Sequence, residues 1–380
     1  MTTTLRVIVD EVIAPSSTGV GRYAEELARE LIATAPFDCE VSGVVSASPE
    51  ADYDRLRELL PGMSHLFKSA LARRELYLAW QRGFTRLPGS GMVHAPSLLA
   101  PLARHDSVNS IGDQTAVTVH DVVAWTHPDS MTPRQVAWHK STVKRAARYA
   151  DAVVVPTYTV AAQLGELVDF GDRIRVIGGA ASERLTVGDD VDARADALGL
   201  PERYVLTTAT LEPRKQLRAL LQSLATEQDA GLPLVIIGAG DWRDQTVSAV
   251  AAEAGVAPER VIHLGTVSDD DLSVALDRAA VFAFPSLGEG FGLPVLEAFR
   301  FGTPVVHSQD PAVVEVAAGA GITVPSDDAA EYPDRLAAAI SSVVGDAAWA
   351  ARLGVAGRDR SRAFSWRDSA QRVWQLHADL

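Results

Sequence analysis

The stretch FPSLGEGFGLPVLE, residues Phe284–Glu297, indicates how this 380-residue chain folds. An apolar run ends at Pro285, a loop with glycine at alternate positions follows, and Pro294 stands where a helix would begin. Proline is favourable at the start of a helix because its missing N–H would have no partner there. The stretch therefore predicts a buried strand, a glycine-rich loop and a helix in succession.

The same strand–loop–helix order recurs on both sides of this stretch. Apolar runs without alternation, such as AVVVP over Ala152–Pro156 and LVIIG ending at Gly238, are typical of strands buried on both faces of a parallel sheet. In each half of the chain we expect six strands, near Leu5–Val12, Cys39–Ser46, Met92–Pro96, Ala116–Val122, Ala152–Thr157 and Ile174–Ile177, then Tyr204–Thr210, Pro233–Gly238, Val261–Gly265, Val281–Pro285, Thr303–His307 and Gly321–Pro325. Helices are expected between them, for example at Gly21–Thr34, Pro133–Ala150, Leu217–Ala225 and Pro294–Phe301. This alternation predicts an α/β protein with two doubly wound parallel sheets.

The acidic, turn-rich segment Thr186–Pro201 is the expected division between two domains, 1–185 and 186–365. Open α/β sheets bind ligands outside the carboxyl ends of their strands. Two such domains that face each other predict an inter-domain cleft, and we expect the chemistry there.

Composition excludes several classes of protein. Hydrophobic residues make up 47% of the chain, as in a globular protein, and 35 Lys and Arg against 49 Asp and Glu give a net charge of −14. Such an acidic chain is a poor candidate for binding nucleic acid. The single cysteine, Cys39, excludes an internal disulfide and any multi-cysteine metal site. We find neither a signal-like leader nor an apolar run of about 18–20 residues, so we expect a cytoplasmic protein.

The glycine-rich loop is the first candidate site. The N–H groups of Gly288, Gly290 and Gly292 at a helix N-terminus would suit an anionic or polar ligand. Glu289 in the loop and Glu297, expected in the first helical turn, could both serve such a site. The alternative is that Glu297 only complements the helix dipole and Glu289 is solvated.

The segment TATLEPRKQL, Thr208–Leu217, is the second candidate. If Pro213 opens a helix, Arg214 and Lys215 lie in its first turn, where cations oppose the dipole unless an anion compensates them. A diphosphate would do so, because Arg offers a planar fork and Lys a point charge. The alternative is a pair of solvated surface cations.

Two weaker signals lie in the first half. The segment STGVGR, Ser17–Arg22, contains Gly19 and Gly21, but Ala24 occupies the third glycine position, which disfavours a dinucleotide site. A turn that lets another ligand approach and a plain strand-to-helix turn both stay open. His120, beside Asp121 at the end of an expected strand, is either a functional or a structural histidine.

Taken in order, eight segments resemble the retaining, nucleotide-sugar-dependent glycosyltransferases of family 4, which have the GT-B fold. They are STGVGRYAEELAREL, MVHAP, TVHD, IRVIG, TATLEPRKQL, LVIIGAG, VIHLGTV and FPSLGEGFGLPVLEAFRFGTPVV. The last carries the family's two glutamates separated by seven residues, and EPRK is most similar to members that transfer mannose-like sugars to bacterial polysaccharide or lipid-linked acceptors. The resemblance implies two facing Rossmann-like domains and a final helix, 366–380, that returns to the first domain.

The resemblance also implies roles for residues of the second domain. Arg214 and Lys215 would hold the donor diphosphate, Glu297 both ribose hydroxyls, and Glu289 hydroxyls of the donor sugar. The backbone amides beside the sugar and diphosphate would come from Gly290, Phe291 and Gly292.

In the first domain, the resemblance makes Gly19 and Gly21 a loop that closes over the diphosphate and places His120 near the 6-hydroxyl of the donor sugar. His120, Glu289, Arg214 and Lys215 are thus the predicted catalytic residues.

The function expected is transfer of a hexose, with mannose favoured, from a GDP- or UDP-linked sugar to a hydroxyl of a glycan, polyprenyl-linked or small-molecule acceptor, with retention. Arg214 and Lys215 would meet the charge that develops on the leaving diphosphate. No carboxylate cluster has metal-ligand spacing, so we expect no metal and no other cofactor. Open alternatives are a nucleotide-sugar epimerase, a sugar phosphorylase, a non-catalytic sugar-nucleotide-binding subunit and a solute-binding protein.

Two basic segments suggest a membrane surface. Ser64–Arg86 is predicted to form an amphipathic basic helix, and Pro133–Tyr149 is similarly basic. Such helices could contact anionic lipid peripherally at the inner face of the membrane. Ordinary helices with solvated outer faces are the alternative.

Overall fold

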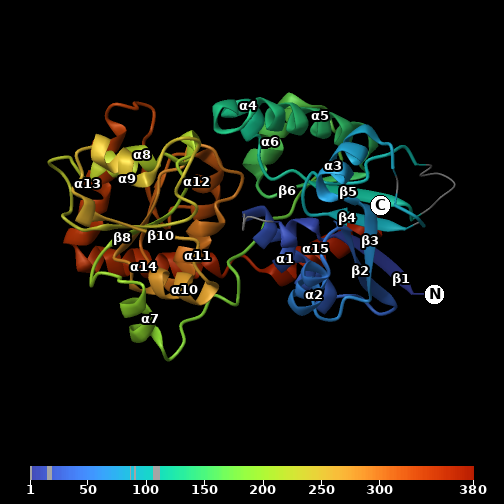
Figure 1. The fold of residues 1–380 in the computed structure, drawn as a ribbon, viewed down its shortest axis with the longest axis horizontal. Helices are drawn as coiled ribbons and strands as arrows, with labels where there is room; N and C mark the ends of the chain where they lie inside the picture. Colours follow the sequence, from blue (N-terminus) through green and yellow to red (C-terminus); the bar gives the residue numbers. More distant parts are fainter. Residues whose placement is uncertain (1, 15–18, 86, 90, 106–111) are drawn as a thin grey trace. The chain divides into compact units, whose positions relative to one another are not determined.

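The computed structural model describes residues 2–14, 19–85, 87–89, 91–105 and 112–380 (Figure 1). The chain divides into unit 1, Met1–Gly179 with Ser365–Leu380, and unit 2, Ala180–Phe364. The first division lies at Gly179, because Ala181 and Leu185 already pack into the core of unit 2. The sequence analysis placed that division after residue 185.

Unit 1 is a parallel sheet with helices between its strands. In the described residues the strand order is β3-β2-β1-β4-β5-β6-β7. The strands are β1 Thr3–Ile8, β2 Cys39–Ala47, β3 His65–Ala72, β4 Met92–Ala95, β5 Gln114–Thr118, β6 Ala152–Val155 and β7 Ile174–Val176. The helices are η1 Asp10–Ile13, α1 Gly19–Ala33, α2 Glu50–Leu59, α3 Arg73–Arg82, α4 Val123–Thr126, η2 Pro128–Ser130, α5 Pro133–Tyr149, α6 Tyr158–Leu167 and α15 Trp366–Asp379. The strand order reverses at β1 and β4, which is the switch point where open sheets bind ligands.

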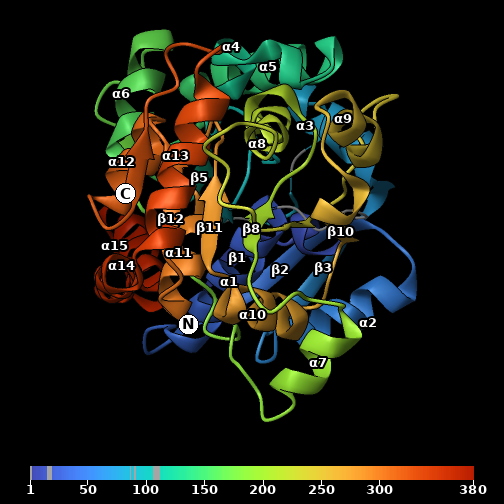
Figure 2. The ribbon, with the colours of Figure 1, turned by 90° about the vertical axis from the view of Figure 1, so that its left-hand side faces the viewer.

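Unit 2 lies wholly within the described residues and repeats this architecture. Its parallel order is β10-β9-β8-β11-β12-β13, and β12, β11, β8 and β10 can be followed in this order in Figure 2. The strands are β8 Val205–Thr208, β9 Leu234–Ile237, β10 Val261–Gly265, β11 Val281–Phe284, β12 Val305–Ser308 and β13 Ile322–Val324. The helices are α7 Val191–Ala197, η3 Pro213–Lys215, α8 Leu217–Ser223, α9 Val247–Glu253, η4 Pro258–Arg260, α10 Asp269–Arg278, α11 Leu293–Phe301, α12 Pro311–Ala317, α13 Tyr332–Gly345 and α14 Ala347–Ser361. Here the switch point lies between β8 and β11.

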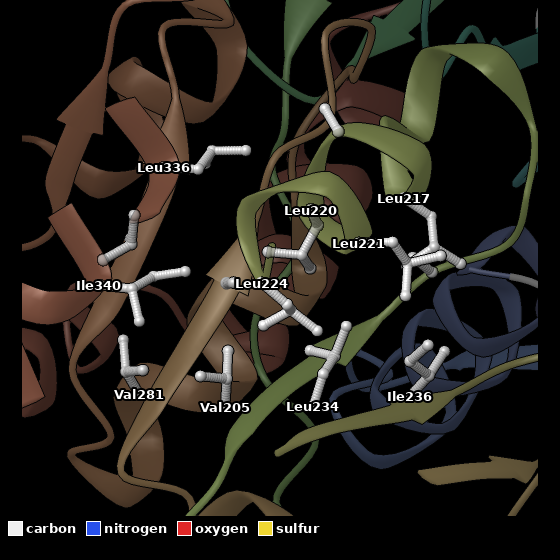
Figure 3. Close-up of a cluster of buried hydrophobic side chains, with 14 of the residues drawn as sticks. Val205, Leu217, Leu220, Leu221, Leu224, Leu234, Ile236, Val281, Leu336 and Ile340 are labelled. Atoms are coloured by element: carbon white, nitrogen blue, oxygen red, sulfur yellow. The ribbon is translucent and has the colours of Figure 1, made fainter. Parts of the chain in front are cut away.

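A leucine-rich cluster fixes α8 on this sheet (Figure 3). Leu220 and Leu221 of α8 are fully buried in one cluster with Leu234 of β9 and with Leu336 of α13. Burying each such side chain stabilises the fold by roughly 1.5–3 kcal/mol. Because η3 immediately precedes α8, this packing also fixes the position of Arg214 and Lys215.

The prediction of one amphipathic helix over Ser64–Arg86 is wrong. His65–Ala72 is strand β3, parallel to β2, and only Arg73–Arg82 is a helix. β3 lies at the edge of the sheet, so its side chains alternate between covered and exposed positions rather than forming an apolar run. The alternating residues of β3 run directly into α3, and together the two elements have the mixture of apolar and basic residues expected of one amphipathic helix.

The last helix packs within unit 1. Trp374 of α15 donates its indole N–H to the carbonyl of Leu31 in α1 at 3.2 Å, and Ser369 donates to the carbonyl of Gly178 at 2.8 Å.

In the described part of the chain no single helix is long and apolar enough to cross a membrane. One bent pair of helices, Tyr332–Gly345 with Ala347–Asp379, has the length and composition of a membrane span, by these two criteria alone.

Candidate active site

Two loops at the switch point of unit 2 are joined through their backbones. β8 pairs directly with β11, and the carboxyl ends of these strands lead into η3 and into the glycine-rich loop, residues 285–292. The carbonyl of Arg214 accepts hydrogen bonds from the Leu287 amide at 2.8 Å and from the Ser286 hydroxyl at 3.3 Å. The side chains of both loops therefore meet at one edge of the sheet.

Glu289 stands at the centre of this edge. Its Oε1 accepts hydrogen bonds from Lys215 Nζ at 2.5 Å, Ser286 Oγ at 2.6 Å and Arg214 Nη1 at 3.2 Å. Burial alone would raise the pKa of Glu289, but the charges of Lys215 and Arg214 and the hydrogen bonds from Lys215 and Ser286 outweigh it and lower the pKa below its usual value. Glu289 is therefore ionised, and the two cations converge on one of its oxygen atoms.

The local helix geometry differs from the prediction. Arg214 and Lys215 lie in the 3-10 turn η3, while α8 begins at Leu217 after Gln216, whose φ is 52°. The cations are thus outside the first turn of an α-helix, and the argument that they oppose its dipole does not hold. Their charges are compensated within the protein, by Glu289 and, for Arg214, also by Glu212 at 3.1 Å.

Asp310, which the sequence analysis did not select, supports the loop that carries Glu289. Its Oδ2 accepts the Glu289 amide at 3.3 Å, and its Oδ1 accepts the amides of Ala312 and Val313, each at 3.0 Å, at the start of α12. Burial, opposed by the Val313 amide and aided by the charge of Glu289, raises the pKa of Asp310 to about 6. The Asp-Pro pair before α12 signals a helix start; the contact with Glu289 spans 21 residues and has no local signal.

Two further hydroxyl groups hold the same loop. Ser308 Oγ donates to the carbonyl of Ser286, and the Tyr332 hydroxyl donates to the carbonyl of Pro285 at 2.9 Å. The loop backbone is therefore fixed from β12 and from α13 before any ligand arrives.

The second glutamate of the pair lies deeper than predicted. Because α11 begins at Leu293, Glu297 falls in its second turn and not in the first, and Glu297 is only 5% exposed. The Glu289 side chain is only 13% exposed and is paired with two cations, so the alternative of a solvated Glu289 carboxylate is wrong.

Gly290, Phe291 and Gly292 connect Glu289 to α11. Gly292 has φ of 88°, in the left-handed region that favours glycine, and Phe291 packs edge-to-face on Phe364 with ring centroids 5.6 Å apart. The Phe291 side chain thus serves the core of unit 2, which leaves its backbone for any contact with a ligand.

His120 lies after β5 in unit 1. Its Nε2 is 2.7 Å from the carbonyl of Pro96 and its ring packs edge-to-face on Tyr23. Because a carbonyl only accepts, Nε2 carries the proton and Nδ1 is the acceptor of the neutral ring. Burial lowers the pKa of His120, although the bond to Pro96 and the charges of Asp121 and Glu11 oppose it.

The glycine motif of unit 1 is helical and not a loop. α1 begins at Gly19, so Gly19 and Gly21 both lie in its first turn, whereas the predicted helix began at Gly21 and the resemblance implied a loop at both glycines. Ser17 and Thr18 of the motif lie outside the described residues.

A carboxylate cluster at the switch point of unit 1 was missed from the sequence. Glu11 follows β1 and accepts hydrogen bonds from Arg73 at 2.6 Å, the Tyr77 hydroxyl at 2.6 Å and the Ser97 hydroxyl at 3.4 Å. Arg73 and Tyr77 belong to α3, whose start the wrong helix prediction concealed. The cluster puts largely buried charged and hydroxyl groups at the carboxyl ends of β1 and β4.

We also looked for side chains that could bind a metal ion. Over the described ranges, no group of three or more His, Cys, Asp or Glu side chains is arranged to hold a metal ion.

Two doubly wound parallel sheets of this order give the chain the GT-B fold. Residues 17–180 match the family model for Glycosyltransferase Family 4, and residues 202–346 match that for Glycosyl transferases group 1. The chain belongs to the family 4 glycosyltransferases.

Individual relatives agree with this assignment. The O-antigen chain mannosyltransferase B of Escherichia coli is 27% identical over 95% of this chain and 96% of its own. Among solved structures, sucrose-phosphate synthase from Thermosynechococcus elongatus superposes with a TM-score of 0.73 at 20% identity, covering 99% of this chain and 98% of its own. HepE from Anabaena, solved in complex with UDP and glucose, has a TM-score of 0.74 at 17% identity and full coverage of both chains. These structural likenesses show the fold.

Proposed function

We propose that the protein is a retaining hexosyltransferase that moves a mannose-like sugar from a GDP- or UDP-linked donor to a hydroxyl of a glycan or polyprenyl-linked acceptor. The observation that carries the proposal is the convergence of Lys215 and Arg214 on one oxygen of Glu289, at 2.5 and 3.2 Å. The similarity to an O-antigen chain mannosyltransferase supports the choice of sugar and acceptor.

The chemistry requires stabilisation of negative charge. As the bond between the anomeric carbon and the diphosphate breaks, charge develops on the leaving group, and cations already in place stabilise that charge without reorganisation. Lys215 and Arg214 are held by Glu289 and by the backbone of the neighbouring loop, so they are in place beforehand. Glu289 then receives hydroxyls of the donor sugar, and Glu297 receives those of the ribose. We propose that no metal and no other cofactor takes part.

On unit 1 we propose that neutral His120 accepts a hydrogen bond from the donor sugar through Nδ1. We assign the acceptor to the surface formed by Glu11, Tyr77 and Ser97, because a carboxylate and hydroxyls suit the hydroxyls of a glycan.

Thermal-shift screening tests the proposal. GDP, UDP, ADP and their hexose conjugates are compared, and a ligand at about 100 times its dissociation constant adds about 2.7 kcal/mol of stability. The nucleotide that stabilises the protein is then supplied as its sugar, and release of the nucleoside diphosphate is measured with and without a glycan acceptor. Conversion of the sugar without any acceptor would indicate an epimerase instead.

We also propose a cytoplasmic enzyme that contacts anionic membranes through the exposed cations Arg134, Lys144 and Arg148 of α5. The contribution expected from 64–86 is smaller than predicted, because Lys68 and Arg73 are paired with Glu50 and Glu11. Co-sedimentation with liposomes of graded anionic lipid content tests the contact, and binding that does not depend on lipid charge would contradict it.

A further inference from the structure

Glu289 and Asp310 are neighbouring carboxylates in the proposed donor site, and of these two only Glu289 is paired with Lys215 and Arg214 in the described residues. Glu289 has Lys215 and Arg214 on its Oε1. Asp310 is 7% exposed, and over the residues described it forms no ion pair with Lys or Arg. Its partners are backbone amides, two on Oδ1 and the Glu289 amide on Oδ2 at 3.3 Å.

Glu289 of the glycine-rich loop is the group whose charge acts on Asp310. Arg214 and Lys215 of η3 contact Glu289, and Arg214 also pairs with Glu212. The other titratable groups on the neighbouring elements are Glu297 of α11, His307 of β12 and Glu315 of α12. His307 Nδ1 donates to the carbonyl of Ser308, and burial lowers the pKa of His307, so its ring is neutral. The balance of charge at Asp310 therefore depends on how far Arg214 and Lys215 neutralise Glu289.

A bound diphosphate would compete with Glu289 for the positive charge of Lys215 and Arg214. Lys215 Nζ and Arg214 Nη1 now approach one atom, Glu289 Oε1, and a donor diphosphate held by the same nitrogen atoms must share them or displace that atom. Negative charge in the site rises by that of the ligand, while the number of cations stays the same. In a buried site the least compensated carboxylate responds by binding a proton.

We propose that Asp310 takes up a proton from the solvent when a nucleotide diphosphate sugar binds, and releases it when the nucleotide leaves. The inference rests on the proposed function, because it concerns the same donor site. One O–H bond forms on Asp310 as water or buffer gives up a proton, and no bond of the donor is broken.

The geometry selects Asp310 Oδ2 over Glu289 as the atom protonated. Oδ2 has one long hydrogen bond, whereas Glu289 Oε1 has three donors. Oδ1 keeps the amides of Ala312 and Val313 in either state, so protonation leaves the start of α12 intact. Burial has already raised the pKa of Asp310 to about 6. Asp310 is thus a positioning residue that adjusts the charge of the site.

Calorimetry in two buffers of different ionisation enthalpy tests the proposal on the intact wild-type protein. GDP-mannose and UDP-glucose are the probes, since their diphosphate diesters do not titrate near neutral pH. We expect uptake of up to about one proton per donor at pH 7.5, and affinity that weakens by up to about tenfold per pH unit above 7. Binding without proton uptake overturns the proposal.

A matched pair of variants identifies the group. Asp310→Asn keeps a side chain suited to capping α12 but cannot ionise, so donor binding should become independent of pH. Asp346→Asn, at the start of α14 where Asp346 accepts the Trp349 amide at 2.8 Å, should keep the wild-type dependence. Undiminished proton uptake in Asp310→Asn overturns the proposal. Failure of both probes to bind at any pH instead contradicts the proposed function, and if Asp310→Asn does not fold, the two-buffer result on the wild type decides.

Discussion

Lys215 Nζ lies 2.5 Å from Glu289 Oε1, although 74 residues separate the two in the chain. Both side chains are largely buried, at 18% and 13% exposure. Removing one partner of a buried pair leaves the other uncompensated, which costs more than losing a surface pair. The contact therefore links Lys215 of η3 to the glycine-rich loop that carries Glu289. A substitution of either residue is expected to affect the other.

Lys215→Ala should reduce turnover by about 10²–10³-fold, the equivalent of about 3–4 kcal/mol of transition-state stabilisation, because the leaving diphosphate loses a preorganised cation. Release of nucleoside diphosphate from the donor found by screening measures this. Arg218→Ala is the control: Arg218 lies in α8 and forms an exposed ion pair with Glu253 at 2.7 Å. Near-normal turnover of Lys215→Ala would contradict the proposal that Lys215 holds the donor diphosphate.

Glu289→Gln should separate binding of the nucleotide from transfer of the sugar. The amide cannot hold Lys215 and Arg214 by charge, so UDP or GDP should bind at least as tightly as to the wild type. Turnover should fall about 10–100-fold, because a charge-assisted hydrogen bond to the sugar is worth about 1.5–3 kcal/mol. Calorimetry and kcat measure the two effects, with the exposed Glu253→Gln as control. Equal losses of nucleotide affinity and of kcat would instead indicate that the glycine-rich loop has lost its structure.

Acid should destabilise unit 1 through His377 of α15. Its Nδ1 is 3.1 Å from the Gln114 side-chain oxygen, its Nε2 is buried without a partner among the described residues, and its ring packs edge-to-face on His94. Burial lowers the pKa of His377 to about 4. Between about pH 6.5 and 4 the unfolded chain binds the proton and the folded one does not, so stability is lost as pH falls through this window.

His377→Gln should remove about 3 kcal/mol of that acid-dependent loss. Guanidinium unfolding at several pH values, followed by tryptophan fluorescence, gives the difference between variant and wild type. His65→Gln, on the exposed edge of β3, is the matched control. An identical loss in the wild type and in His377→Gln would show that His377 does not cause it.

Chelation should leave transfer unchanged. If Lys215 and Arg214 supply the positive charge that the departing diphosphate needs, then the rate with excess EDTA should equal the rate without it. The protein is treated with EDTA and assayed after buffer exchange, with and without added Mg²⁺ or Mn²⁺. A rate that collapses and is restored by one metal would contradict the metal-independent proposal.

Local patterns predicted the central strands well, because these strands are buried on both faces and read as continuous apolar runs. β6, AVVV, and β9, LVII, are wholly buried in the structure. The edge strand β3 was missed because its side chains alternate. Arg214, Lys215 and Glu289 could be selected together because the loops that carry them follow strands β8 and β11, whose apolar runs are evident in the sequence.

What could not be predicted depends on distant contacts or on single backbone angles. Gln216 adopts φ of 52°, which separates η3 from α8, and no residue type at that position signals the break. Asp310 reaches the Glu289 amide from the end of another strand, and Glu11 gains Arg73 from a segment 62 residues away. Such partners follow from sheet order, which the sequence leaves open.

His120→Ala should lower turnover about tenfold, the cost of one neutral hydrogen bond of about 1–1.5 kcal/mol to the donor sugar, with little effect on nucleotide binding. Because burial lowers the pKa of His120, the ring is already neutral at pH 7, and kcat should show no inflection from it between about pH 7 and 8. His127→Ala is the control, since in the described chain the His127 ring makes one hydrogen bond, with the neighbouring Thr126 hydroxyl at 3.0 Å. If His120 instead acted as a charged group, turnover would rise as pH falls through 7, and the variant would lose that rise together with its activity.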